Sequence, residues 1–341
     1  MQEFTNQLIG TVAVAVQYLL GQLLVVIRYP LDPSQRIFVV FLATSLILAA
    51  FVYFRRRRTG GSENFGAFLF PRSVWSNPSA WLDVRYFFFH QIFWLVIYGS
   101  FLIGIITLVS GWANDFALYL TSDDKSGPGP LRPLATVMLI SVIAVASDFT
   151  SFLAHYLQHK VPILWEFHKV HHSATVMHPL TNYREHPVDN ILYAVALGST
   201  IAVVSGLTIL CIGRVPDMST LSSGGVIMLA FNLLGYNLRH SHIWLKWPGA
   251  LSKIFGSPAH HQVHHSCHPD HIDKNFAFMF PVWDVLFRTY EMPENDRTIQ
   301  LGLGNPEECE FRSCLTLYFL PFCKAFRHIR SPANSAPERP T

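Results

Sequence analysis

Charged residues are scarce in this chain of 341 residues. Lys, Arg, Asp and Glu make up 14% of it, whereas soluble proteins carry about a quarter. The formal net charge is only +3, and no basic stripe with interleaved aromatic residues occurs, which argues against nucleic-acid binding. Half of the residues are hydrophobic, including 27 Phe. The composition therefore indicates a membrane protein.

Cysteine is also sparse and shows no pattern. Its five residues form neither a CxxC pair nor a regular frame: Cys211, Cys267, Cys309, Cys314 and Cys323. We therefore expect reduced thiols rather than a thiolate metal site or a disulfide scaffold. Histidine is the abundant residue instead, with 17 copies concentrated in a few short stretches.

Six apolar runs approach the roughly 20 residues that a spanning helix needs. The first has no basic segment before it and is as long as the others, which favours a retained span over a cleaved signal peptide. The second is short, and the sixth is diluted by the segment SSGG, so these two are the weakest. The six runs cover residues 9–27, 37–54, 87–113, 134–154, 191–213 and 220–238.

Basic residues predict the orientation of these runs, because Lys and Arg favour the cytoplasmic side of short loops. Residues 55–86 hold RRRR at 55–58 plus Arg72 and Arg85, more than the neighbouring connections. Counting crossings from this loop places both histidine-rich segments, residues 155–186 and 240–271, on the cytoplasmic face. The membrane would be the endoplasmic reticulum in a eukaryote or the inner membrane in a bacterium.

Three histidine motifs have the spacing of metal ligands on helices. HYLQH at 155–159 has i, i+4 spacing, and HKVHH at 168–172 and HQVHH at 261–265 each have i, i+3, i+4 spacing, which places their rings on one helix face. Neutral imidazole binds iron, zinc and copper. One metal rarely takes more than four imidazoles, so nine candidates suggest two ions. The nine are His155, His159, His168, His171, His172, His240, His261, His264 and His265.

Other residues are weaker candidates. His186 is a candidate tenth ligand, and His242 and His268 are either ligands or neighbours of ligands. Asp148 shares a helix face with His155, and an acid inside a span needs a partner. We expect that partner to be a ligand histidine, since metal-bound imidazoles often donate to carboxylates. The remaining acids offered for this role, with less support, are Asp189, Asp270, Asp273 and Asp284.

These motifs resemble the fatty acid hydroxylase/sterol desaturase superfamily of integral-membrane di-iron enzymes. Its pattern, HxxxH followed by two HxxHH motifs, is present, as are the surrounding LWEFHKVHHS, REHP and SPAHHQVHHS. The resemblance covers about residues 134–290. The chain departs from the usual pattern at His242, where many relatives have Asn, and at Ala277 and Arg288, where glycine is usual.

The resemblance implies a fold and a chemistry. The fold is all-α and polytopic, with two or three transmembrane helical hairpins and a cytoplasmic, histidine-rich helical cap. The nine histidines would bind two iron ions (Fe2+/Fe3+), with O2 as co-substrate. The enzyme would hydroxylate or desaturate a lipid from the bilayer, of fatty acyl or sterol type. Because no cytochrome b5 domain is apparent, electrons would come from a separate donor, either cytochrome b5 or ferredoxin with its reductase.

The expected organisation has three parts. Residues 1–133 form an N-terminal transmembrane region with a basic cytoplasmic loop, residues 134–290 form the catalytic domain, and residues 291–341 form a C-terminal segment with a disordered tail from Ser331. The apolar segment before that tail is too short to span and is expected at the interface or packed on the cap.

Two other functions fit the sequence less well. A divalent metal transporter with cytoplasmic His-rich loops is the alternative, although transport sites normally lie near the bilayer midplane. A metalloprotease is disfavoured because the sequence contains no HExxH motif.

Overall fold

The computed structural model describes residues 20–93, 133–212, 225–294 and 299–330, together with isolated positions between 13 and 119. Within these ranges the chain is helical, with one isolated β-bridge between Ser266 and Leu301 and no named strand. The all-α prediction is therefore confirmed. The tail from Ser331, predicted to be disordered, lies outside the described residues.

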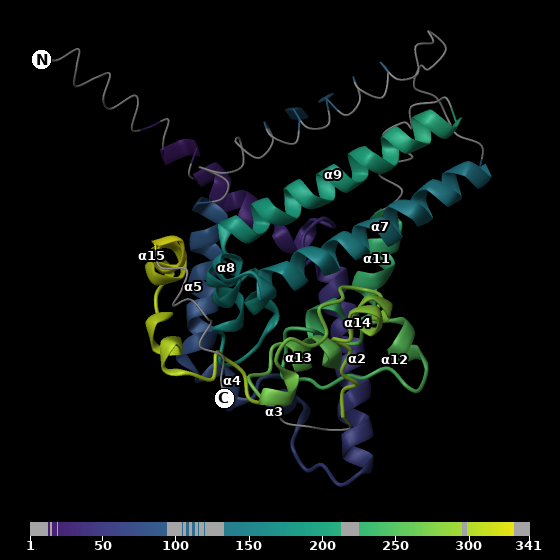
Figure 1. The fold of residues 1–341 in the computed structure, drawn as a ribbon. Helices are drawn as coiled ribbons and strands as arrows, with labels where there is room; N and C mark the ends of the chain where they lie inside the picture. Colours follow the sequence, from purple (N-terminus) through teal and green to yellow (C-terminus); the bar gives the residue numbers. More distant parts are fainter. Residues whose placement is uncertain are drawn as a thin grey trace, which may run out of the picture.

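The described elements are short helices around a few long ones (Figure 1). The α-helices are α2 (Val39–Arg58), α3 (Phe65–Leu69), α4 (Arg72–Trp75), α5 (Pro78–Phe93), α7 (Pro133–Lys160), α8 (Pro162–His172), α9 (Pro187–Ile212), α11 (Gly225–Leu233), α12 (Leu251–Ile254), α13 (Pro258–His264), α14 (Val282–Phe287) and α15 (Cys314–Arg330). The 3-10 helices are η1 (Tyr29–Leu31), η3 (Pro179–Tyr183), η4 (Tyr236–Leu238), η5 (Pro269–His271) and η6 (Pro306–Glu310).

Among the described residues, three helices are long and apolar enough to cross a membrane: α2, α7 and α9. They correspond to the second, fourth and fifth predicted runs. Helices α7 and α9 pack side by side and project from the rest of the described chain (Figure 1). Side chains such as Val142, Val203 and Leu207 are more than half exposed along them, as expected for surfaces that face lipid.

The other three predicted runs are not seen as long helices. The first and third extend into residues outside the described ranges, so α5 shows only the beginning of the third. Within the sixth run the structure describes α11, Gly225–Leu233, whereas residues 220–224 lie outside the described ranges. Gly235 follows in the left-handed conformation, at φ 81°, which an α-helix cannot continue.

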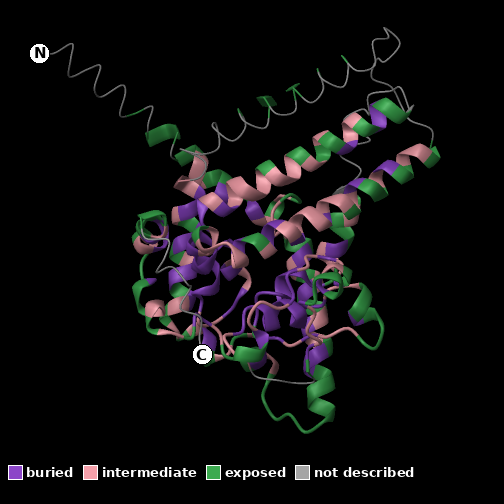
Figure 2. Cartoon of the chain, viewed as in Figure 1, coloured by how far each residue is buried: buried purple, intermediate pink, exposed green. Residues whose placement is uncertain are grey.

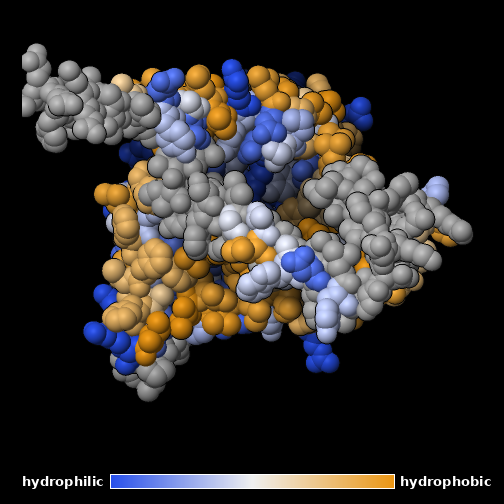
Figure 3. All heavy atoms as spheres, turned by 90° about the horizontal axis from the view of Figure 1, so that it is seen from above, coloured by the Kyte–Doolittle hydropathy of each residue, from blue (hydrophilic) through white to orange (hydrophobic). Residues whose placement is uncertain are grey.

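Buried residues gather in the body from which α7 and α9 project (Figure 2). Ala49 and Tyr53 of α2 pack against Leu238 and Ile243, and Leu317 of α15 packs in a cluster with Val170 of α8. These contacts fix the segments that carry the histidine motifs. From above, hydrophobic side chains cover large parts of the visible described surface (Figure 3).

Candidate metal centre

The end of α7 and the whole of α8 carry the first two histidine motifs. His155 and His159 occupy the last two turns of α7, and only Val161 separates this helix from α8. Pro162 begins α8 because proline fits the first helical position, where its missing N–H is not needed. His168, His171 and His172 lie in the second half of α8. The tight junction therefore directs both motifs into one region.

The third motif lies on α13 and the residue that follows it. Ser257 caps this helix, with its backbone N–H 3.2 Å and its hydroxyl 2.7 Å from Nδ1 of His260, and Pro258 takes the first position. His261 and His264 lie on α13, while His265 is its C-terminal cap. The cap and the proline explain why a helix begins at this point.

His240 reaches the same region from the segment after η4. The amide nitrogen of Gln262 on α13 lies 2.8 Å from the carbonyl oxygen of Leu238 and 3.0 Å from those of Ser241 and Ile243. Gln262 is 2% exposed. These contacts tie the segment that carries His240 to the helix that carries His261 and His264.

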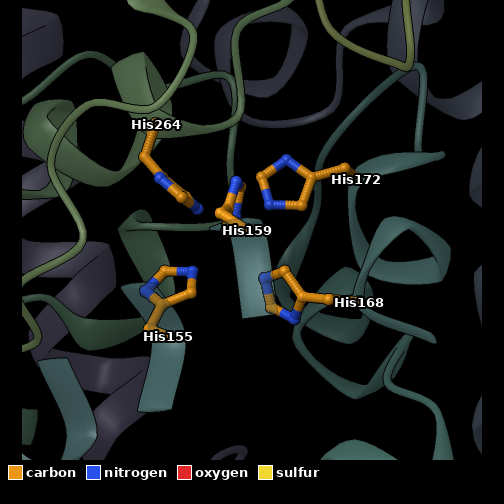
Figure 4. A group of neighbouring side chains, drawn as sticks. All are labelled: His155, His159, His168, His172 and His264. Atoms are coloured by element: carbon orange, nitrogen blue, oxygen red, sulfur yellow. The ribbon is translucent and has the colours of Figure 1, made fainter. Parts of the chain in front are cut away.

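Five imidazoles form what we call the first histidine group. One ligand nitrogen from each lies within 4.8 Å of those of all the others. Figure 4 shows the five rings arranged around a common space, with residues from α7, α8 and α13. Four members are buried and one is half-buried. The group consists of His155, His159, His168, His172 and His264.

Four imidazoles form the second histidine group: His171, His240, His261 and His265. The Nε2 atom of His240 lies 3.1 Å from Nε2 of His171 and 3.0 Å from Nε2 of His261. Nε2 of His265 lies 3.1 Å from Nε2 of His261. The structure thus brings together all nine histidines that the sequence singles out.

The motifs do not each build one group. HKVHH gives His168 and His172 to the first group and His171 to the second. HQVHH does the reverse, because His264 joins the first group while His261 and His265 join the second. Each group therefore contains residues of both motifs.

The second ring nitrogen of several of these histidines faces an oxygen atom. The Nδ1 atoms of His155, His171 and His264 lie 2.9, 3.2 and 2.8 Å from the carbonyl oxygens of Phe276, Arg184 and Lys274, respectively. A ring that donates from Nδ1 to a carbonyl presents an unprotonated Nε2 to a metal. These contacts orient the imidazoles for binding through Nε2.

Carboxylates face two more rings of the first group. Asp189 lies 3.4 Å from Nδ1 of His168, and Asp273 lies 3.6 Å from Nδ1 of His159. Asp273 also pairs with Lys160 at 2.7 Å. The sequence analysis gives both acids as weaker candidates than Asp148 for the carboxylate partner of a ligand histidine.

Burial keeps the imidazoles outside the spanning helices neutral. It lowers the pKa of His168 and His172 well below the usual value and that of His264 to about 3. Burial likewise lowers the pKa of all four members of the second group, and neighbouring imidazoles lower that of His240 and His265 further. A neutral imidazole is the form that binds a metal ion.

Unpartnered nitrogens show that the two groups fit metal ions. Four Nε2 atoms are buried without a hydrogen-bond partner, those of His159, His168, His172 and His264. Each such unpartnered nitrogen costs about 1–3 kcal/mol. In the second group, neighbouring Nε2 atoms are 3.0–3.1 Å apart. Nitrogen ligands at about 2.1 Å from one ion would be about 3.0–3.4 Å apart. Nitrogen-only donors suit iron, zinc, copper or nickel.

Arg239 sets His261 apart from the other ligands. Its guanidinium lies 3.1 Å from Nδ1 of His261 and also donates to the carbonyl oxygen of Phe278 at 3.0 Å. A guanidinium has no acceptor, so Nδ1 of His261 accepts this hydrogen bond. Metal binding through Nε2 of His261 therefore requires an imidazolate ring or a small shift of Arg239.

The predicted partner of Asp148 was wrong. Its carboxylate accepts hydrogen bonds from the backbone N–H groups of Met279 and Phe280, at 2.8 and 3.1 Å, and from the indole of Trp283, at 2.8 Å. The step of seven positions from Asp148 to His155 places them about 10 Å apart along α7. Asp148 therefore anchors the segment before α14 to a spanning helix.

Three other candidates lie outside both groups. His186 bonds the carbonyl oxygen of Tyr318 through Nε2, at 2.9 Å, while its Nδ1 accepts from the N–H of Val188. His242 lies 2.7 Å from the carbonyl oxygen of Phe68. His268 is part of an exposed pair with Asp270 at 3.6 Å. These contacts assign structural or surface positions to the three residues.

Arg184 has a positioning role that the sequence analysis missed. This side chain is 1% exposed and donates to Asp83 at 2.9 Å, to the hydroxyl of Ser173 at 2.9 Å and to the carbonyl oxygen of Phe311 at 3.3 Å. Its own carbonyl oxygen faces His171. The motif REHP contains it, but a lone arginine in the sequence gives no sign of burial.

Comparisons with known proteins agree with this geometry. Residues 140–289 match the sequence profile described as fatty acid hydroxylase. An alkylglycerol monooxygenase of Danio rerio is 32% identical over 159 residues, 47% of this chain and 31% of that protein. An ornithine lipid hydroxylase of Rhizobium tropici is 26% identical over 174 residues, 50% of this chain and 46% of that protein. A cholesterol 25-hydroxylase-like protein of Danio rerio is 31% identical over 170 residues, 48% of this chain and 58% of that protein.

The match thus spans about a third of the length of the alkylglycerol monooxygenase. No solved structure gives a significant match.

Proposed function

We propose that this chain, whose residues 140–289 belong to the fatty acid hydroxylase family, is a membrane-bound di-iron oxygenase that hydroxylates a lipid. The observation that carries the proposal is the convergence of nine imidazoles in two neighbouring groups. The relatives are described as hydroxylases and a monooxygenase, which favours hydroxylation over desaturation. The substrate would be of fatty acyl or sterol type.

The reaction would add one atom of O2 to a C–H bond of the lipid and release the other as water. It consumes two electrons and two protons, delivered by a separate donor such as cytochrome b5 or ferredoxin with its reductase. Iron held by the two histidine groups would supply the activation of O2, and the protein provides orientation and exclusion of water. Asp189 and Asp273 support that orientation because they face the rings of His168 and His159.

The position of the groups supports a substrate that comes from the bilayer. His155 and His159 lie at one end of α7, a helix able to span the membrane, so a lipid can reach them without leaving its leaflet. The arginines at 55–58 support a cytoplasmic location of that end. A transporter would instead need ligands near the middle of its spans.

The test compares ligand variants with a matched histidine control. We expect the purified protein to bind about two iron ions, and His171→Ala and His264→Ala each to lose about one of them and all oxygen-dependent lipid hydroxylation. His242→Ala should keep both, because His242 lies outside the two groups. Mass spectrometry of lipids should show the gain of one oxygen atom in one class. Full activity in both ligand variants would overturn the assignment.

A further inference from the structure

Helix α15 has two hydrophobic faces, of which the described chain covers only one. Leu317, Tyr318 and Ala325 are buried, and the helix packs against α8 and α5. A second set, the exposed stripe, is 45–62% exposed and consists of Leu315, Phe319, Phe322, Phe326 and Ile329. Steps of three and four residues place the whole stripe on one side of the helix. Contiguous exposed hydrophobic side chains mark an interaction surface.

The middle of α15 lies level with the start of a spanning helix. The carbonyl oxygen of Tyr318 is 2.9 Å from Nε2 of His186, and His186 directly precedes Pro187, the first residue of α9. The hydroxyl of Tyr318 lies 2.7 Å from Nδ1 of His90 in α5. A spanning α9 would enter the bilayer at this level, so these contacts would bring α15 to the boundary between the lipid and the aqueous phase.

The direction of α15 differs from that of the spanning pair. In Figure 1 α15 is viewed roughly along its axis, whereas α7 and α9 are viewed from the side, so α15 lies across their direction. The left margin of the view from above, where α15 lies in Figure 1, carries hydrophobic side chains (Figure 3). A helix of 17 residues is about 25 Å long and in this direction would lie along a leaflet.

Exposed arginines surround the exposed stripe. Arg327 and Arg330 lie in the last turn of α15, and Arg312 lies just before its first residue. Lys324 differs, because it is buried and pairs with Glu307 and Glu310. Arginines beside a hydrophobic stripe are the pattern of a helix that lies on an anionic bilayer surface.

The tail of this chain does not match the exposed stripe. Residues 331–341 contain no Leu, Ile, Val, Met or aromatic side chain, so they offer nothing that would pack on three phenylalanines. The location beside α9 and the flanking arginines both favour lipid over a second protein.

We propose that α15 lies in the headgroup region of an anionic bilayer leaflet, with the exposed stripe toward the acyl chains and Arg312, Arg327 and Arg330 toward the headgroups. The helix would thereby hold α8 at the membrane. Its other face is tied to α8 by two polar contacts: Glu307 bridges Lys324 to Lys169, and Nε2 of His328 lies 2.9 Å from Glu166. This inference is independent of the reaction and extends beyond it.

The experiment measures the depth of single positions in the full chain. The five native cysteines, none of them in a histidine group, are replaced by serine. Single cysteines then replace Phe319, Phe326 or Ile329 in the stripe, or Arg327 beside it as the matched control. Each variant receives a nitroxide label in nanodiscs of phosphatidylcholine and phosphatidylglycerol. Power saturation compares collision of the label with O2, which enters lipid, and with a water-soluble nickel chelate.

The expected ratio of O2 to nickel accessibility is severalfold higher at the three stripe positions than at Arg327. Nanodiscs of phosphatidylcholine alone contain no anionic lipid for Arg330 to contact. In them the ratio of O2 to nickel accessibility at the neighbouring position 329 should therefore fall. Equal nickel accessibility at all four positions would overturn the proposal. Spectral broadening that disappears when labelled protein is diluted with unlabelled protein would show a second copy on the stripe and overturn it as well. Retained iron in each variant shows that the chain is folded.

Discussion

Each HxxHH motif contributes histidines to both histidine groups. In HKVHH the outer pair, His168 and His172, serves the first group, and His171 serves the second. Adjacent residues on a helix point in directions about 100° apart, which is why neighbours such as His171 and His172 belong to different groups. A single substitution in either motif would therefore remove a proposed ligand from one group and leave those of the other in place.

Asp189 provides a test of ligand orientation at the scale of one residue. Asp189→Asn should keep the shape of the side chain but remove the carboxyl group that faces Nδ1 of His168. We expect the apparent iron affinity of the first group to fall by about 10–100-fold, measured by competition with a chelator. Asp270→Asn is the control, since that side chain is 85% exposed and should leave the affinity unchanged. Equal loss in both variants would argue against an orienting role.

At the scale of single elements, the stability of α13 comes from its polar contacts, because the helix is short. It has seven residues, too few for an isolated helix to be stable in water. The cap at Ser257 and the carbonyl contacts of Gln262 hold it against the segment that carries His240. This small helix positions two proposed ligands and is followed at once by a third, His265.

Replacing Gln262 should test that arrangement. Gln262→Met retains most of the volume but leaves the carbonyl oxygens of Leu238, Ser241 and Ile243 without this donor. We expect the free energy of unfolding to fall by about 1–3 kcal/mol and the second group to lose iron before the first. Ser257→Ala, at a cost of about 1 kcal/mol, should destabilise α13 without that selectivity. Urea unfolding and metal analysis measure both effects.

At the scale of the whole molecule, the sequence allowed the fold class and the nine convergent histidines to be predicted, because helical spacing is local information. Contacts between distant segments could not be predicted in the same way. The sequence places Asp148 and His155 on one helix face, yet the donors to Asp148 come from Met279, Phe280 and Trp283. Hydrophobicity alone also did not reveal that α11 ends before Gly235.

The buried histidines also predict how stability depends on pH in the metal-free protein. Burial lowers the pKa of His260 and His264 to about 3, while the unfolded value is about 6.5. Above about pH 6.5 neither state binds these protons, so stability does not change. Between about pH 6.5 and 3 only the unfolded state binds them, so the free energy of unfolding falls with pH, by up to about 1.4 kcal/mol per unit for each histidine.

Unfolding of chelator-treated protein at several pH values measures this slope. His260→Gln should make the dependence of the free energy of unfolding on pH shallower, by the contribution of one proton. His260 is suitable because it lies outside both histidine groups, so its removal leaves the proposed ligands in place. An unchanged slope in this variant would contradict the assignment of a neutral, buried His260.

The junction at Val161 links the metal ligands to the mechanics of the membrane. His155 and His159 lie at the end of α7, and one residue separates that helix from α8, while His264 belongs to α13. A spanning helix adapts to a thinner bilayer by tilting. Tilt of α7 would move His155 and His159 relative to His264. The thickness of the surrounding bilayer would therefore change the spacing of the proposed ligands, so the lipid around the protein would influence the geometry of the candidate metal centre.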